Sequence, residues 1–205
     1  MHGIPEAVRI PSPSPFLLGR TPVTNAQYAV FLQSGRVPPP PWWKRAGFGS
    51  PRQPVVGASW EDARLFTIWL SEMSGERWRL PTEAEWEFAA CGGLAAPATA
   101  WGDEIPPGEI PDGPLSAPWE TGRGTPNGYG LLDMGTIVHE WCLDVYRPDG
   151  RAVEADAEPP PESLRRSSRG GSWRHRVRWS SPSARSSLPP TFRYADYGFR
   201  VLREA

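Results

Sequence analysis

The sequence has few cysteines and no long hydrophobic run. Cys91 and Cys142 are the only cysteines among 205 residues, too few for the disulfide framework of a small secreted domain. No apolar segment follows Met1, and no run approaches the roughly 18 apolar residues that a membrane-spanning helix needs. We therefore expect a cytoplasmic protein that has no membrane partner.

The sequence also lacks an excess of either charge. A net charge of -1 at pH 7 gives no reason to expect a nucleic acid or a membrane surface as partner. The charges are unevenly distributed, because residues 103–162 contain 13 acidic residues and three arginines, whereas residues 163–195 contain eight arginines and no acid. Either the two segments neutralise each other, or the arginines form a basic surface that binds an acidic group.

Proline, glycine and tryptophan are abundant, at 26, 21 and 11 residues. Proline and glycine average about 5% and 7% of protein sequences, so this chain is rich in both. Disordered chains are poor in aromatic residues, and we therefore expect a loop-rich fold held by large aromatic side chains. The longest irregular connection is expected between Gly92 and Asn127, with Trp101 and Trp119 as candidate anchors.

Three short amphipathic helices are expected in the first half of the chain. They begin after Thr24, Ser59 and Thr82 and end near Gly35, Gly75 and Gly92. Thr24 with Gln27, and Thr82 with Glu85, match the capping box, in which two side chains satisfy free N–H groups at a helix start. The expected buried residues are Tyr28, Phe31 and Leu32, then Ala63, Phe66, Trp69, Leu70 and Met73, then Trp86, Ala89 and Ala90.

Short strands are expected in the last third, at residues 131–134, 138–143, 169–173 and 197–202. A charged, proline-rich loop separates the second from the third of them, between Asp149 and Ser168. Helices followed by short strands predict an α+β fold. Residues 1–16 are expected to form an extended N-terminal arm and residues 17–205 a single domain.

Six sequence segments together resemble one known family. They are residues 21–28 (TPVTNAQY), 54–63 (PVVGASWEDA), 79–87 (RLPTEAEWE), 127–134 (NGYGLLDM), 169–173 (RGGSW) and 198–200 (GFR). In this order they resemble the formylglycine-generating-enzyme family, also called the sulfatase-modifying-factor family. The resemblance implies a loop-rich C-type-lectin-like fold with few short helices and short antiparallel strands. Founding members oxidise a cysteine of a sulfatase peptide to formylglycine, using O₂ and copper held by two active-site cysteines.

The sequence departs from that family at the catalytic cysteines. By the resemblance, His175 and Ser180 stand where the two thiols would be, and no cysteine follows Cys142. Copper(I) prefers thiolate ligands, so copper is not expected and we predict a non-catalytic domain. Cys91 and Cys142 occupy positions that are structural in the family, and we expect both to be buried.

Other metals are also disfavoured. Family members often carry an asparagine that can help to hold calcium, and Ile137 takes its place here. Calcium needs about 6–8 oxygen ligands, so the lost ligand argues against calcium, and no cofactor is predicted. A metal site made of His139, His175 and Glu140 is one alternative, and the other is a hydrogen-bonded His139 with a solvated His175.

The resemblance places residues 173–197 on an exposed face. Its candidate ligand-binding residues are Arg174, His175, Arg176, Arg178, Trp179, Phe192, Arg193, Tyr194, Asp196 and Tyr197. Arginine, tyrosine and tryptophan are enriched where interfaces bind most strongly, and arginine pairs with carboxylate or phosphate. We predict a binding module for a protein or for an acidic small-molecule ligand.

Three alternatives remain. The spacing also resembles the variable ligand-binding proteins of diversity-generating retroelements, although Trp179 and residues 187–190 do not resemble diversified positions. An enzyme with altered, non-cysteine metal-dependent oxidative chemistry is the second alternative, and a Ser180 nucleophile would need a base such as His175. Nucleic-acid binding through the arginines is the third, and the overall charge disfavours it.

Overall fold

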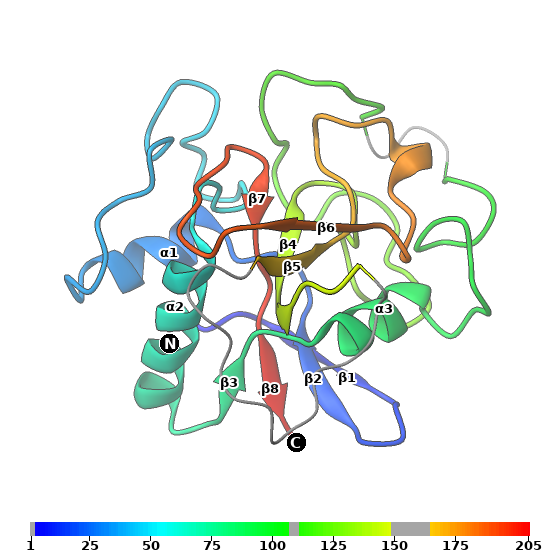
Figure 1. The fold of residues 1–205 in the computed structure, drawn as a ribbon, viewed down its shortest axis with the longest axis horizontal. Coiled ribbons are helices and arrows are strands. Elements are labelled where there is room, and N and C mark those ends of the chain that lie inside the picture. Colours follow the sequence, from blue (N-terminus) through cyan, green and yellow to red (C-terminus); the bar gives the residue numbers. More distant parts are fainter. Residues whose placement is uncertain (1–2, 107–110, 149–164) are drawn as a thin grey trace.

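The computed structural model describes residues 3–106, 111–148 and 165–205. Two four-stranded sheets and three α-helices form the framework (Figure 1). The first sheet has the order β1 (Ala7–Ile10), β2 (Phe16–Gly19), β8 (Leu202–Glu204) and β3 (Trp78–Arg79), with antiparallel neighbours. The second has the order β6 (Arg185–Leu188), β5 (Arg166–Arg169), β4 (His139–Val145) and β7 (Tyr197–Gly198), in which β4 and β7 run parallel. The predicted α+β class is therefore confirmed.

The helices are α1 (Asn25–Leu32), α2 (Trp60–Ser74) and α3 (Glu83–Cys91), and η1 (Val177–Trp179) is one 3₁₀ turn. The predicted capping boxes at Thr24 and Thr82 are confirmed, and Ser59 with Asp62 forms a third. Gly75 and Gly92 end α2 and α3 in the left-handed conformation, which glycine adopts without steric cost. In the part of the chain that the structure describes, no helix is long and apolar enough to span a membrane.

Several sequence predictions need correction. Met73 was expected on the buried face of α2, but its side chain is 62% exposed, because burial in this helix stops at Leu70. Residues 131–134 form no strand; their path bends at Asp133, which has a φ of 58°. The strand expected at 169–173 lies earlier, as β5. The N-terminal arm needs no such correction, since Ala7–Ile10 within it is extended as β1 and pairs with β2.

Aromatic side chains fill the main core between α1, α2 and the C-terminal segment. Phe66 lies at its centre, with its ring centroid 5.8 Å from Tyr28, 5.4 Å from Phe31, 5.4 Å from Trp69 and 5.4 Å from Phe199. Such ring pairs are worth about 0.5–1.5 kcal/mol each beyond the area that they bury. This packing explains how a chain with little regular structure keeps a defined core.

A buried ion pair joins the second sheet to the C-terminal segment. Arg200 Nε lies 2.6 Å and Nη2 2.9 Å from the carboxylate oxygens of Glu140, and both side chains are 0% exposed. Trp86 Nε1 donates to the same carboxylate at 2.7 Å, while Arg200 also donates to the carbonyls of Gly19 and Leu132. These contacts compensate for the free-energy cost of removing the two charges from water.

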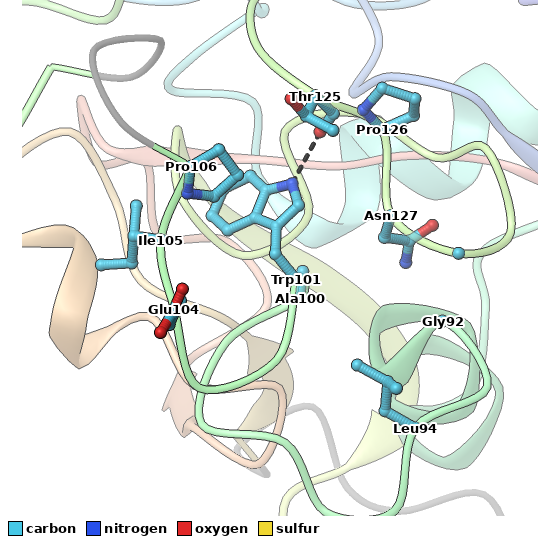
Figure 2. Close-up of a pocket in the computed structure, with 11 residues that line it drawn as sticks. Gly92, Leu94, Ala100, Trp101, Glu104, Ile105, Pro106, Thr125, Pro126 and Asn127 are labelled. Atoms are coloured by element: carbon cyan, nitrogen blue, oxygen red, sulfur yellow. Dashed lines mark hydrogen bonds between the residues drawn. The ribbon is translucent and has the colours of Figure 1, made fainter.

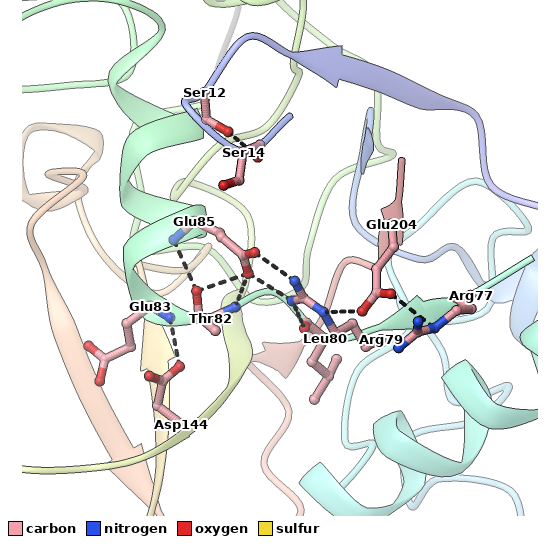
Figure 3. Close-up of polar contacts among 10 residues, drawn as sticks. All are labelled: Ser12, Ser14, Arg77, Arg79, Leu80, Thr82, Glu83, Glu85, Asp144 and Glu204. Carbon is pink, nitrogen blue, oxygen red and sulfur yellow. Dashed lines mark hydrogen bonds and ion pairs between the residues drawn. The ribbon is translucent and has the colours of Figure 1, made fainter. Parts of the chain in front are cut away.

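A polar network positions the start of α3 (Figure 3). The Arg79 guanidinium donates to both oxygens of Glu85, at 2.7 and 2.6 Å, and to Glu204 of β8 at 3.3 Å. The backbone N–H of Glu83 donates to Asp144 of β4 at 2.7 Å. Helix α3 is therefore tied to both sheets at its N-terminal end.

Two arginines of residues 163–195 pair with acids that lie outside residues 103–162. Arg169 pairs with Glu83 at 3.0 Å and with Glu87 at 2.7 Å, and Arg185 donates to Glu83 at 2.8 Å. These acids belong to α3, not to the acidic segment 103–162, because α3 packs against β5. The neutralisation of the two segments by each other stays a prediction, because many acids of residues 103–162 lie outside the described residues.

We expect Arg200→Met to destabilise the fold by about 3–5 kcal/mol, because it leaves the Glu140 carboxylate buried without its counter-charge. Urea unfolding followed by circular dichroism measures the change. Arg20→Ala is the control, since its pair with Glu6 is exposed and worth about 0–1 kcal/mol. Adding Glu140→Gln to Arg200→Met should recover part of the loss. Equal losses in Arg200→Met and Arg20→Ala would contradict this role.

Candidate functional site

The predicted binding residues separate into exposed and buried groups. Arg174, Arg176, Arg178, Phe192 and Tyr194 are exposed, and His175 is half-buried. Asp196 and Tyr197 are buried, and Arg193 forms an ion pair with Asp62 at the start of α2, with Nη2 2.9 Å from the carboxylate. The backbone of Trp179 belongs to η1, but its side chain lies outside what the structure describes. We call six of these residues the recognition face: Arg174, His175, Arg176, Arg178, Phe192 and Tyr194.

A chain of rings connects the two halves of this face, the arginine half (residues 174–178) and the aromatic half (Phe192 and Tyr194). Starting from His175, successive centroids lie 5.2 Å apart to His139, 4.9 Å to Tyr197, 6.3 Å to Tyr194 and 6.3 Å to Phe192. The parallel pairing of β4 with β7 places His139 opposite Tyr197 and so brings the halves together. The exposed aromatic pair and the exposed arginines therefore share one framework.

Further contacts fix the arginine half. The guanidinium of Arg174 lies over the Trp173 ring, 4.8 Å from its centroid, and its Nε is 3.8 Å from Asp196. Trp173 Nε1 donates to the Ala195 carbonyl at 3.3 Å. Asp196 therefore contributes from below the surface, as a partner for Arg174.

A small polar cluster lies beneath the face. His139 Nδ1 is 2.7 Å from the Gly170 carbonyl oxygen, which fits an N–H donor at Nδ1. Ser172 Oγ lies 3.3 Å from Asp196 Oδ2 and 3.4 Å from His175 Nδ1. Burial lowers the pKa of His139, partly offset by the negative charge of Asp196. Sequence reasoning missed Ser172 as a site residue, although it lies in the 169–173 motif.

The two residues expected at the thiol positions, His175 and Ser180, do not suit copper. Ser180 is buried with no hydrogen-bond partner for Oγ among the described atoms. Both cysteines lie elsewhere and are free, Cys142 fully buried in β4 and Cys91 only half-buried at the end of α3. Burial was expected for both cysteines. It is confirmed for Cys142, whereas Cys91 is partly exposed because it is the last residue of α3. Imidazole and hydroxyl do not replace two thiolates for copper(I).

The alternative metal sites do not fit either. Glu140 cannot join His139 and His175, because its carboxylate is used by Arg200 and Trp86. Neighbouring strand residues point to opposite faces, which separates Glu140 from His139. Ile137, which was expected at the calcium position, is fully buried in an apolar cluster. Across residues 3–106, 111–148 and 165–205 there is no group of three or more ligating side chains that could hold a metal.

Comparison with known proteins decides the family. The sulfatase-modifying factor enzyme 1-like domain matches residues 5–205. The chain belongs to the sulfatase-modifying factor family. It is 32% identical to a formylglycine-generating enzyme from Streptomyces coelicolor, over 93% of this chain and 79% of that one. The family that the six segments indicated is therefore confirmed.

Solved structures confirm the fold. PvdO from Pseudomonas aeruginosa has a TM-score of 0.77 at 25% identity, over 98% of this chain and 91% of that one. Variable protein 1 of Treponema denticola has a TM-score of 0.71 at 21% identity, over 100% and 94% of the two chains. The second likeness shows the shared fold alone.

We expect the pKa of His139 to lie below 6.5, the ordinary value, because burial opposes its charging. Asp196→Asn should lower it further, since this change removes a nearby negative charge. Titration of the imidazole C–H signals by NMR measures both values, and the His139→Gln spectrum assigns them. A higher pKa in Asp196→Asn than in the wild type would contradict the geometry of the cluster.

Proposed function

We propose that this chain is a non-catalytic binding module of the sulfatase-modifying factor family, acting through the recognition face. The observation that carries the proposal is the exposure of arginines and aromatics on one ring-connected framework. Phe192 and Tyr194 are 46% and 45% exposed and stack on each other. Adjacent exposed aromatic residues form an apolar patch, and such a patch favours a binding surface.

The chemistry of the face favours an acidic partner. Arg174 and Arg176 are exposed, and Arg176 has no ion-pair partner among the described residues. Arginine forks bind carboxylate or phosphate groups through paired hydrogen bonds. The neighbouring rings offer rigid apolar area, which loses little entropy on binding. An acidic peptide segment with an apolar neighbour satisfies both halves of the face, and we therefore propose a protein partner of this kind.

Catalysis is the second candidate, since relatives in this family are formylglycine-generating enzymes. The cluster of His139, His175, Ser172 and Asp196 provides polar groups beneath the recognition face. Ser172 is fully buried, however, and a nucleophile must be reachable. The binding proposal therefore has the stronger support.

Selection from a random peptide display library on the wild-type protein tests the binding proposal. We expect enriched peptides to be acidic and to lose at least about tenfold in affinity for the Arg174→Ala, Arg176→Ala double variant. Arg9→Ala with Arg45→Ala is the matched control, since these arginines are also exposed. Phe192→Ala with Tyr194→Ala should weaken binding similarly, whereas Ile68→Ala with Met73→Ala should not. Peptides that bind the face variants and the wild type equally would refute the proposal.

The non-catalytic part has its own test. Incubation with copper(I), oxygen and a cysteine-containing sulfatase-type peptide should give no peptidyl aldehyde, because the thiol pair is missing. Mass spectrometry of the peptide detects the aldehyde, and the Streptomyces coelicolor enzyme under the same conditions is the positive control. Aldehyde formed by this chain would show that it is an oxidase.

A further inference from the structure

A cavity of about 460 Å³ lies at the C-terminal end of α3 (Figure 2). It is lined by Gly92, Leu94, Ala100, Trp101, Glu104, Ile105, Pro106, Thr125, Pro126, Asn127 and Gly128. It shares no lining residue with the recognition face. Its volume is within the roughly 300–1,000 Å³ of small-molecule sites, and its lining is mostly apolar, as is typical of them.

The walls of this cavity are held in place before any ligand arrives. The indole N–H of Trp101 donates to the Thr125 carbonyl at 2.6 Å, and Figure 2 shows its ring between the 104–106 and 125–127 segments. Thr99 and Gly102 exchange backbone hydrogen bonds of 2.9 and 3.1 Å beside it. The Trp101 ring is therefore a fixed aromatic wall.

Asn127 fixes the opposite wall. Its amide nitrogen donates to the Ala89 and Ala90 carbonyls at the end of α3, at 2.8 and 3.3 Å. Its side-chain oxygen accepts from the backbone N–H groups of Tyr129 and Leu131, both at 3.1 Å. The protein itself thus occupies the hydrogen-bonding groups of this amide, and the specificity of the cavity must come from other residues.

The electrostatic character of the cavity is negative. Glu104 is exposed and is the one charged residue among those that line it. Helix α3 has no basic residue in its last turn, so the helix itself brings no positive charge to this end of the cavity. A carboxylate and a fixed indole ring together favour a cation, because a ring face attracts positive charge.

The rim of the cavity is apolar and exposed. Leu94 and Ile105, both lining residues, are 48% and 37% exposed. Phe88 in α3 is 38% exposed and stacks on Tyr129, 5.8 Å between centroids. Three of the exposed large hydrophobic side chains therefore belong to α3 or to the loop segments around its C-terminal end. This apolar surface suits a ligand with a hydrophobic body as well as a charge.

We propose that this cavity binds an organic cation, an ammonium group attached to an aromatic or aliphatic body. The ammonium pairs with the Glu104 carboxylate near the Trp101 ring, and the apolar body lies against Leu94 and Ile105. The proposal is independent of the recognition face, whose arginines would repel such a ligand.

The test uses 2-phenylethylammonium as the probe and 3-phenylpropionate as its anionic counterpart. The indole N–H signals in ¹H–¹⁵N spectra report binding, and the signal that is missing in Trp101→Phe identifies Trp101. We expect the cation to shift the Trp101 signal saturably and to bind more tightly than the anion. Glu104→Gln should weaken the cation about two- to fivefold, which is the size of an exposed cation–carboxylate or cation–π contact.

Two further variants complete the test. Asp103→Asn is the matched control, because Asp103 is also exposed but does not line the cavity, and it should leave the affinity unchanged. Leu94→Lys places a positive charge at the rim and should abolish the shift. An unshifted Trp101 signal, equal binding of the anion, or equal losses in Asp103→Asn and Glu104→Gln would each overturn the proposal.

Discussion

The guanidinium of Arg200 is completely buried, and a charge in that position is tolerated only when its donors find partners. Glu140 neutralises it from β4, Trp86 of α3 shares the carboxylate, and the carbonyls of Gly19 and Leu132 accept the remaining donors. The two sheets, α3 and an irregular loop must therefore meet in one arrangement. Misplacing any one partner would leave a buried charge unpaired, which is costly, so the pair favours the arrangement in which all the partners meet.

The same principle divides the arginines of the last third of the chain. Arg169 and Arg185 are ordered by Glu83, and Arg193 by Asp62, so they connect loops and strands to the helix starts. Arg174 and Arg176 project from the segment that follows Trp173 and are exposed. A basic segment thus supplies structural ties through some of its arginines, while others are exposed in the binding surface that we propose.

The recognition face and the α3 cavity differ in sign. The face carries exposed arginines beside Phe192 and Tyr194, whereas the cavity combines Trp101 with the carboxylate of Glu104. Both use rings held by neighbouring contacts, which lowers the entropy lost on binding. In a fold with little regular structure, both proposed sites lie mainly on irregular loops, since loops carry side chains that packing does not already use.

Local signals determined the helices. Each helix starts at a capping residue, Thr24, Ser59 or Thr82, through contacts within four residues, and two of them end at Gly75 and Gly92. Neighbouring residues were therefore enough to predict where the helices begin and where these two end. The family was also evident from the six segments, because each reads as a contiguous string. The sequence alone likewise excluded a pair of thiols after Cys142.

Only the tertiary structure decided which charges meet and which side chains are exposed. Arg200 lies 60 residues from Glu140 and Arg185 lies 102 from Glu83, and no local pattern encodes such pairs. The burial of Asp196 and Tyr197, the exposure of Met73 and the use of Glu140 as a counter-charge follow from the packing of distant segments. Sequence patterns report interactions between near neighbours, whereas a site assembled from loops depends on contacts that form only when the whole chain has folded.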